Sequence, residues 1–178
     1  MKELSLHILD IAMNSVKAGA SLVEIGLEEA GGTLTLTVAD NGRGMEPEFL
    51  ASVADPFTTT RTTRKVGMGI PLLKLAAEQA GGAFSIESAP GEGTALTASF
   101  QTGHLDNPPL GDMAATLVSL IQGSPGIDFT YTHTAGGGVS SLDTRELRAA
   151  LDGVPLDTPD VLAWIQNSIE EEERGLSQ

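Results

Sequence analysis

The segment that decides the fold is DIAMNSVKAGASLVEIGLEEAGGTLTLTVADNGRGM, residues 10–45, in which a helical pattern gives way to two alternating patterns. Apolar residues recur at helical spacing over residues 4–18, and Gly19 ends the pattern. Apolar and polar residues then alternate over 22–29 and over 33–38, with a glycine turn between the two runs. The segment therefore predicts a helix followed by a β-hairpin that has one buried face and one solvated face.

Four further elements follow this segment. Residues 47–54 and 70–80 have the apolar spacing of helices, and residues 82–88 and 94–100 alternate around a Pro-Gly-Glu-Gly turn. We therefore expect an α+β two-layer sandwich, in which a four-stranded, mainly antiparallel sheet is covered by helices on one face.

A polar segment with two adjacent prolines, residues 101–112, divides the chain. Residues 1–103 carry 7 basic and 12 acidic side chains, whereas residues 104–178 carry 3 and 12. We therefore expect one domain over 1–103 and a small α/β extension over 104–178 that serves as an accessory or partner-binding region.

The extension has its own local patterns. Residues 113–122 predict a packed helix, and 127–133 and 139–142 predict a hairpin. A capping box at Asp143 predicts the next helix. In the final helix we expect Trp164 to be buried and the acidic run EEEE (170–173) to lie on the solvated face.

Composition excludes several classes of protein. The chain has 178 residues with no cysteine, so disulfides and thiolate metal sites are absent. Its 24 acidic against 10 basic residues give a net charge of −14, which argues against a nucleic-acid partner. No run of about 18 apolar residues is present, and Glu3 and Asp10 interrupt the N-terminal apolar stretch. We expect a cytoplasmic protein with no membrane partner.

The first candidate site is a pair of polar residues on the first helix. Asp10 and Asn14 are four residues apart, so they share a helix face, and both residue types are disfavoured inside helices. One interpretation is an exposed polar face. The other is a pair of oxygen ligands for a hard cation such as Mg²⁺.

Two glycine motifs supply further candidates. DNGRGM, from Asp40 to Met45, comes at the end of a predicted strand, where it forms either a plain turn or a backbone that a flat ligand approaches beside a carboxylate. GMG, from Gly67 to Gly69, opens a predicted helix, whose free N–H groups favour phosphate, although a lone GxG is a weak signal. Residues 56–65 before it are either a solvated loop or a basic lid over a polyphosphate.

A third motif, GEGT, comes immediately before the last strand of the predicted sheet. Its glycines are explained by ordinary turn chemistry. Thr94, however, begins the strand, and its hydroxyl would lie beside Asp40 if the two strands are neighbours.

The order of these motifs over residues 3–101 resembles the GHKL superfamily of ATPases, which includes histidine-kinase ATP-binding domains, type II topoisomerases, large heat-shock chaperones and mismatch-repair ATPases. LDIAMNSVKAGAS and DNGRGM are similar to the mismatch-repair branch, and DPFTTTRTTRKVGMGIPLLKLAAEQAGG is similar to the histidine-kinase branch. The resemblance implies a Bergerat fold that binds ATP with Mg²⁺.

The resemblance also implies roles for individual residues. Asn14 would hold Mg²⁺, Asp40 would accept a hydrogen bond from the adenine amino group, and Thr94 would support Asp40 directly or through water. The full set implied to bind the nucleotide is Asn14, Asp40, Gly42, Gly44, Met45, Arg61, Thr62, Arg64, Lys65, Gly67, Met68, Gly69 and Thr94. Asp10 stands where the ATPase branches of this superfamily have a glutamate general base, so hydrolysis is less expected than binding.

Three functions remain open on this basis. The chain is expected to be a regulatory, kinase-like protein that acts on a protein partner, a slow ATPase that assists assembly of a redox enzyme, or a nucleotide-sensing module without turnover. His7 lies on the first helix itself and His104 and His133 lie beyond the motifs, so an autophosphorylating sensor kinase is not expected. The layout resembles stand-alone bacterial ATP-binding proteins, some encoded beside iron-hydrogenase or NADH-oxidoreductase subunits. A redox or regulatory protein is therefore the expected partner, and a homodimer is also considered.

Overall fold

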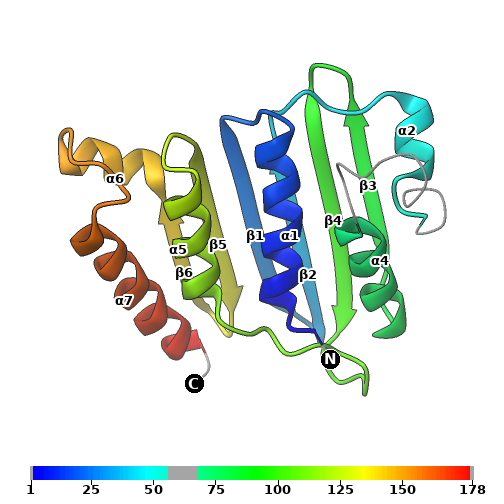
Figure 1. Cartoon of the computed structure of the whole chain (residues 1–178). Coiled ribbons are helices and arrows are strands. Elements are labelled where there is room, and N and C mark those ends of the chain that lie inside the picture. Colours follow the sequence, from blue (N-terminus) through cyan, green and yellow to red (C-terminus); the bar gives the residue numbers. More distant parts are fainter. Residues whose placement is uncertain (1, 56–67, 177–178) are drawn as a thin grey trace.

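The computed structural model describes residues 2–55 and 68–176, which form a mixed sheet with helices packed against it (Figure 1). The helices are α1 (Leu4–Lys17), α2 (Pro47–Ser52), α4 (Gly69–Gln79), α5 (Met113–Gly123), α6 (Thr144–Leu151) and α7 (Pro159–Leu176). The strands are β1 (Leu22–Ala30), β2 (Thr33–Asp40), β3 (Phe84–Ala89), β4 (Gly93–Gln101), β5 (Asp128–Ala135) and β6 (Gly138–Asp143). The α+β class is confirmed.

The two predicted hairpins of the first part are present and lie side by side. β1 pairs with β2 and β3 pairs with β4, each antiparallel, and β2 also pairs with β4. The register sets Asp40, at the end of β2, opposite Thr94 at the start of β4. Two residues that are 54 positions apart in the sequence are therefore cross-strand neighbours.

The predicted sheet of four mainly antiparallel strands is wrong. Within the described residues the sheet has six strands in the order β3-β4-β2-β1-β5-β6, and β5 runs parallel to β1. Val23 lies opposite Phe129 and Ile25 opposite Tyr131, so both strands turn their apolar side chains to the same face. Alternation within a strand shows which face is buried but does not show which distant strand pairs with it.

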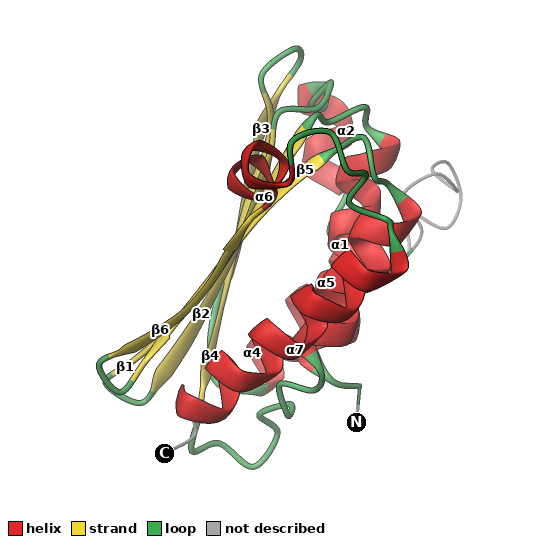
Figure 2. Cartoon of the chain, turned by 90° about the vertical axis from the view of Figure 1, so that its left-hand side faces the viewer, coloured by secondary structure: helices red, strands yellow, loops and turns green. Residues whose placement is uncertain are grey.

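The hydrophobic core lies between this sheet and one layer of helices. Figure 2 shows α1, α4, α5 and α7 together on one side of the sheet. The inward residues of α1, among them Leu4, Ile8 and Ile11, are buried against the inward face of the strands, where Leu36 and Phe100 are fully buried. The amphipathic spacing of the helices thus decides which of their residues face the sheet.

Two expectations for α7 are corrected by the structure. Trp164 is 55 % exposed, because the buried stripe of α7 is formed by Leu162, Ile165 and Ile169 and the indole lies outside it. The acidic run is not wholly solvated, since Glu173 accepts a hydrogen bond from the Tyr131 hydroxyl (2.9 Å) and also bonds to His133.

The division of the chain at residues 103 and 104 stays a prediction. The two parts share the sheet through the β1–β5 pair, and their buried residues belong to one hydrophobic cluster. Across residues 2–55 and 68–176, no helix combines the length and apolar character that a bilayer crossing requires.

Candidate functional site

Asp40 is held at the end of β2 by two hydrogen bonds, one to each carboxylate oxygen. Ser15 on α1 donates its hydroxyl proton to Oδ2 (2.6 Å), and the backbone N–H of Gly42 donates to Oδ1 (2.8 Å). The carboxylate is partly buried between the helix and the strand. Because a carboxylate has about four acceptor positions, Asp40 keeps capacity for a further donor.

Thr94, opposite Asp40, is bonded to Ser88 of the neighbouring strand. The Ser88 oxygen accepts the Met45 backbone N–H (2.9 Å), donates to the Gly93 carbonyl (2.9 Å) and lies 2.8 Å from the Thr94 hydroxyl. A hydroxyl carries one proton, so when Ser88 donates to Gly93 the proton between the hydroxyls comes from Thr94. The predicted support of Asp40 by Thr94 stays a prediction, although the register makes them neighbours.

The glycines of the DNGRGM motif are explained by packing within the protein. A Cβ on Gly42 would lie 2.9 Å from the Ala18 carbonyl oxygen, and Gly44 has a φ of 72° and would place a Cβ 1.9 Å from the Ala89 carbonyl oxygen. The loop therefore passes between the end of α1 and the β3–β4 hairpin, where a side chain does not fit. Contact of either glycine with a ligand stays a prediction.

A second group of predicted residues gathers where α1 meets the start of α4. A Cβ on Gly69, the first residue of α4, would lie 3.3 Å from Asp10 Cβ and 3.7 Å from Asn14 Nδ2. Asn14 Nδ2 is buried and has no hydrogen-bond partner among the described residues. The glycine thus lets the helix start approach the polar face of α1, as a site for phosphate and cation requires.

Asp10 is paired with a residue that the sequence did not single out. Lys2 Nζ lies 2.6 Å from Asp10 Oδ2, and the two side chains are 35 % and 48 % exposed. The Asp10 carboxylate is therefore ion-paired and open to water, at the edge of the cluster where α1 meets the start of α4.

Of the remaining residues predicted to bind the nucleotide, the structure describes Met45 and Met68. Met45 is half-buried against the core, and Met68 directly precedes α4. The rest of the predicted set lies outside the described residues: Arg61, Thr62, Arg64, Lys65 and Gly67.

Sequence reasoning missed Ser15 and Ser88. Ser15 follows Asn14 in a helix interior, where serine is mildly disfavoured. This disfavoured residue type could have marked Ser15 as a candidate site residue. Ser88 carries no local signal, since a serine near the end of a hairpin strand is ordinary. Its role depends on the contact between β3, β4 and the DNGRGM loop.

Comparison with known proteins identifies the fold and the family of the matching region. The family whose model matches residues 2–104 is described as "Histidine kinase-, DNA gyrase B-, and HSP90-like ATPase". The crystal structure of the N-terminal domain of a DNA repair protein superimposes with a TM-score of 0.52, covering 80 % of this chain and 52 % of that one. At 16 % sequence identity this likeness concerns the fold.

Curated relatives are found among bacterial sensor kinases. The sensor histidine kinase ZraS of Klebsiella oxytoca is 32 % identical over 93 residues, which cover 51 % of this chain and 20 % of the kinase. A sensor-like histidine kinase of Rhizobium meliloti is 36 % identical over 98 residues, which cover 50 % and 18 %. The matched part thus spans about a fifth of the length of these relatives.

Proposed function

The chain belongs to the histidine kinase-, DNA gyrase B- and HSP90-like ATPase family, and we propose that it binds Mg-ATP and acts as a kinase-like regulator of a protein partner. Family membership supports ATP binding and kinase-like chemistry. The observation that carries the proposal is the Asp40 carboxylate, which Ser15 and Gly42 fix at a strand end beside Thr94. A carboxylate with spare acceptor capacity in a fixed orientation is suited to the exocyclic amino group of adenine.

The residues around Asn14 fit the magnesium ion that accompanies ATP. The amide nitrogen of Asn14 is buried near Gly69 without a partner, and its carbonyl oxygen makes no hydrogen bond to a described residue. A carbonyl oxygen is a ligand of the kind that Mg²⁺ accepts. When bound, the ion would neutralise phosphate charge, and the free N–H groups at the start of α4 would supply donors for the phosphates.

The proposal is tested by calorimetric titration of ATP with and without Mg²⁺. Asp40→Asn should weaken ATP binding by more than about tenfold, because one amide oxygen must replace a carboxylate that already accepts two hydrogen bonds. Asn14→Ala should leave an ATP affinity that no longer depends on Mg²⁺.

The matched control is Asp157→Asn, which removes the same charge from an exposed loop residue and should leave ATP affinity unchanged. Binding of ATP by Asp40→Asn with wild-type affinity would contradict the proposal, as would a wild-type chain that ignores ATP at millimolar concentration.

The Lys2–Asp10 ion pair favours a second candidate, a nucleotide-sensing module that does not turn ATP over. An exposed carboxylate that is held by an ammonium group is poorly placed to take a proton from water. Labelled ATP distinguishes the two functions. Transfer of the γ-phosphate to a partner protein supports the kinase-like function, and ATP that is bound but stays intact supports the sensing module.

A further inference from the structure

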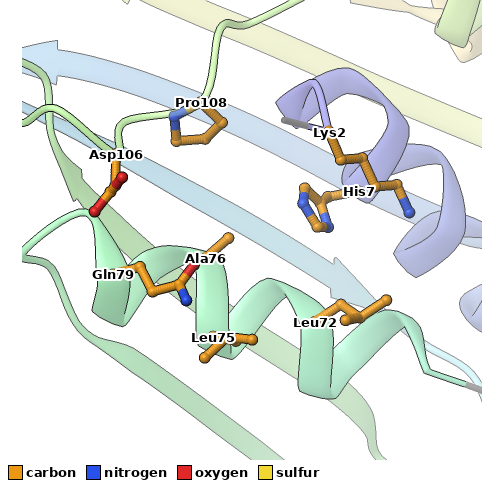
Figure 3. A pocket seen from close by; sticks show the side chains of 8 residues that line it. All are labelled: Lys2, His7, Leu72, Leu75, Ala76, Gln79, Asp106 and Pro108. Atoms are coloured by element: carbon orange, nitrogen blue, oxygen red, sulfur yellow. The ribbon is translucent and has the colours of Figure 1, made fainter.

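A groove between α1 and α4 lies outside the nucleotide site and has a volume of about 410 Å³. Leu72 and Leu75 of α4 form its apolar wall, and Asp106 and Pro108 close it from the segment that follows β4 (Figure 3). Leu72 is 39 % exposed and Leu75 is 49 % exposed. Large apolar side chains gathered in an open groove are typical of a binding surface.

His7 is a buried polar residue that lines this groove. The residue is only 4 % exposed, and Nδ1 has no hydrogen-bond partner among the described residues. Burial lowers the pKa of His7, and the nearby Lys2 lowers it further, so the ring is neutral near pH 7. A buried ring nitrogen without a partner costs free energy that an occupant able to hydrogen-bond would recover.

The charge of the groove favours a cation. The Asp106 carboxylate makes no hydrogen bond or ion pair with any residue in the described part of the chain, and it lies near the Gln79 amide at the same end (Figure 3). Lys2 also lines the groove, but its ammonium group is already paired with Asp10. The free charge is therefore negative, in a protein whose net charge is −14.

We propose that this groove seats an arginine or lysine side chain from a segment of the protein partner. The aliphatic stem lies on Leu72 and Leu75, and the cationic end donates to Asp106. Long basic side chains combine an apolar stem with a charged end in this way. The inference rests on the proposed function, which requires a protein partner.

The groove also adjoins the candidate nucleotide site. His7 precedes Asp10 by three residues on α1, which is about 4.5 Å along the helix axis. Lys2 contributes to the groove wall while its Nζ binds Asp10. A partner segment in the groove is therefore held close to the polar face where the phosphates of ATP are proposed to lie.

The test uses two synthetic peptides and nuclear magnetic resonance of the isotope-labelled full chain. The probe is acetyl-Ala-Leu-Arg-Leu-Ala-amide, and its match replaces arginine with uncharged citrulline. The arginine peptide should shift the His7 ring signals and the backbone amides of Leu75 and Gln79, and the citrulline peptide should bind about fivefold more weakly.

Two charge-removing variants distinguish a specific contact with Asp106 from a general effect of the protein's net charge on peptide binding. Asp106→Asn should weaken the arginine peptide about fivefold, whereas Asp157→Asn, which removes the same charge elsewhere, should not. Equal binding of both peptides, or equal weakening by both variants, would overturn the assignment.

Failure of the proposed function can be told apart from failure of this inference. Asp40→Asn should weaken ATP binding by more than about tenfold and leave the peptide shifts intact. Peptide binding by a chain that does not bind ATP would leave the groove assigned and remove the nucleotide function. ATP binding without any peptide shift at the groove would support the nucleotide function and overturn the assignment of the groove.

Discussion

At the scale of single residues, Gly44 determines how closely the loop after β2 can approach the β3–β4 hairpin. Gly44 lies in the loop between β2 and α2, with a positive φ, and the Ala89 carbonyl occupies the space that a Cβ at this position would need. The same loop donates the Met45 N–H to Ser88 and the Gly42 N–H to Asp40. A change at one backbone position therefore acts on the orientation of the Asp40 carboxylate.

Gly44→Ala should destabilise the protein far more than Gly32→Ala. Both glycines have a positive φ, 72° and 79°, but a Cβ at Gly32 meets nothing within 4 Å. We expect the free energy of unfolding to fall by about 1 kcal/mol for Gly32→Ala and by about 3 kcal/mol or more for Gly44→Ala. Urea unfolding measures both, and equal losses would show that the close approach to Ala89 is absent.

At the scale of elements, a partly buried polar cluster links α7 to the sheet. His133 on β5 bonds to Glu29 at the end of β1 (2.6 Å) and to Glu173 on α7 (2.9 Å), and Tyr131 donates to Glu173. Burial by itself lowers the pKa of His133, but the two carboxylates outweigh it and raise the pKa above its ordinary value. Burial likewise opposes ionisation of Glu173, yet the contact with His133 lowers the pKa of that carboxyl.

The stability of the chain should therefore depend on pH through His133. A raised folded-state pKa adds stability that is fully present below about pH 6.5, the unfolded value, and is lost as pH rises through the folded-state value. The lowered pKa of Glu173 adds stability above about pH 4.3, the unfolded value, which is lost as pH falls through the folded-state value.

Urea unfolding at a series of pH values measures this dependence. His133→Gln should remove the fall in the free energy of unfolding above pH 6.5, whereas His104→Gln, at an exposed position, should keep it. The same pH profile for His133→Gln and for the wild-type chain would show that the cluster does not titrate as described.

For the whole molecule, one sheet and one core join the two parts of the chain. β5 pairs with β1 along seven residue positions, and the fully buried side chains include Leu36 from the first part and Phe129 from the second. Elements that share a core unfold together in small proteins.

Unfolding should accordingly be a single transition for both parts. Trp164 is the only tryptophan and reports on α7, whereas circular dichroism reports on all elements. Leu36→Ala, in β2, should lower the urea midpoint by the same amount by both measurements, with a loss of about 2–5 kcal/mol. A Trp164 transition that stays at the wild-type midpoint would show that residues 104–178 fold independently.

The sequence alone determined the type and order of the described helices and strands and pointed to Asp40 as a candidate carboxylate, because periodicity and turn chemistry act between residues close together in the chain. The sequence made the position of Thr94 beside Asp40 conditional on the two strands being neighbours, and the β2–β4 register decided it. Only the tertiary structure decided the parallel β1–β5 pair, the exposure of Trp164, the contact of Ser15 with Asp40 and the groove beside His7. Each of these depends on which distant surfaces pack together. Local spacing shows that a face is apolar or polar, but it does not show what that face meets.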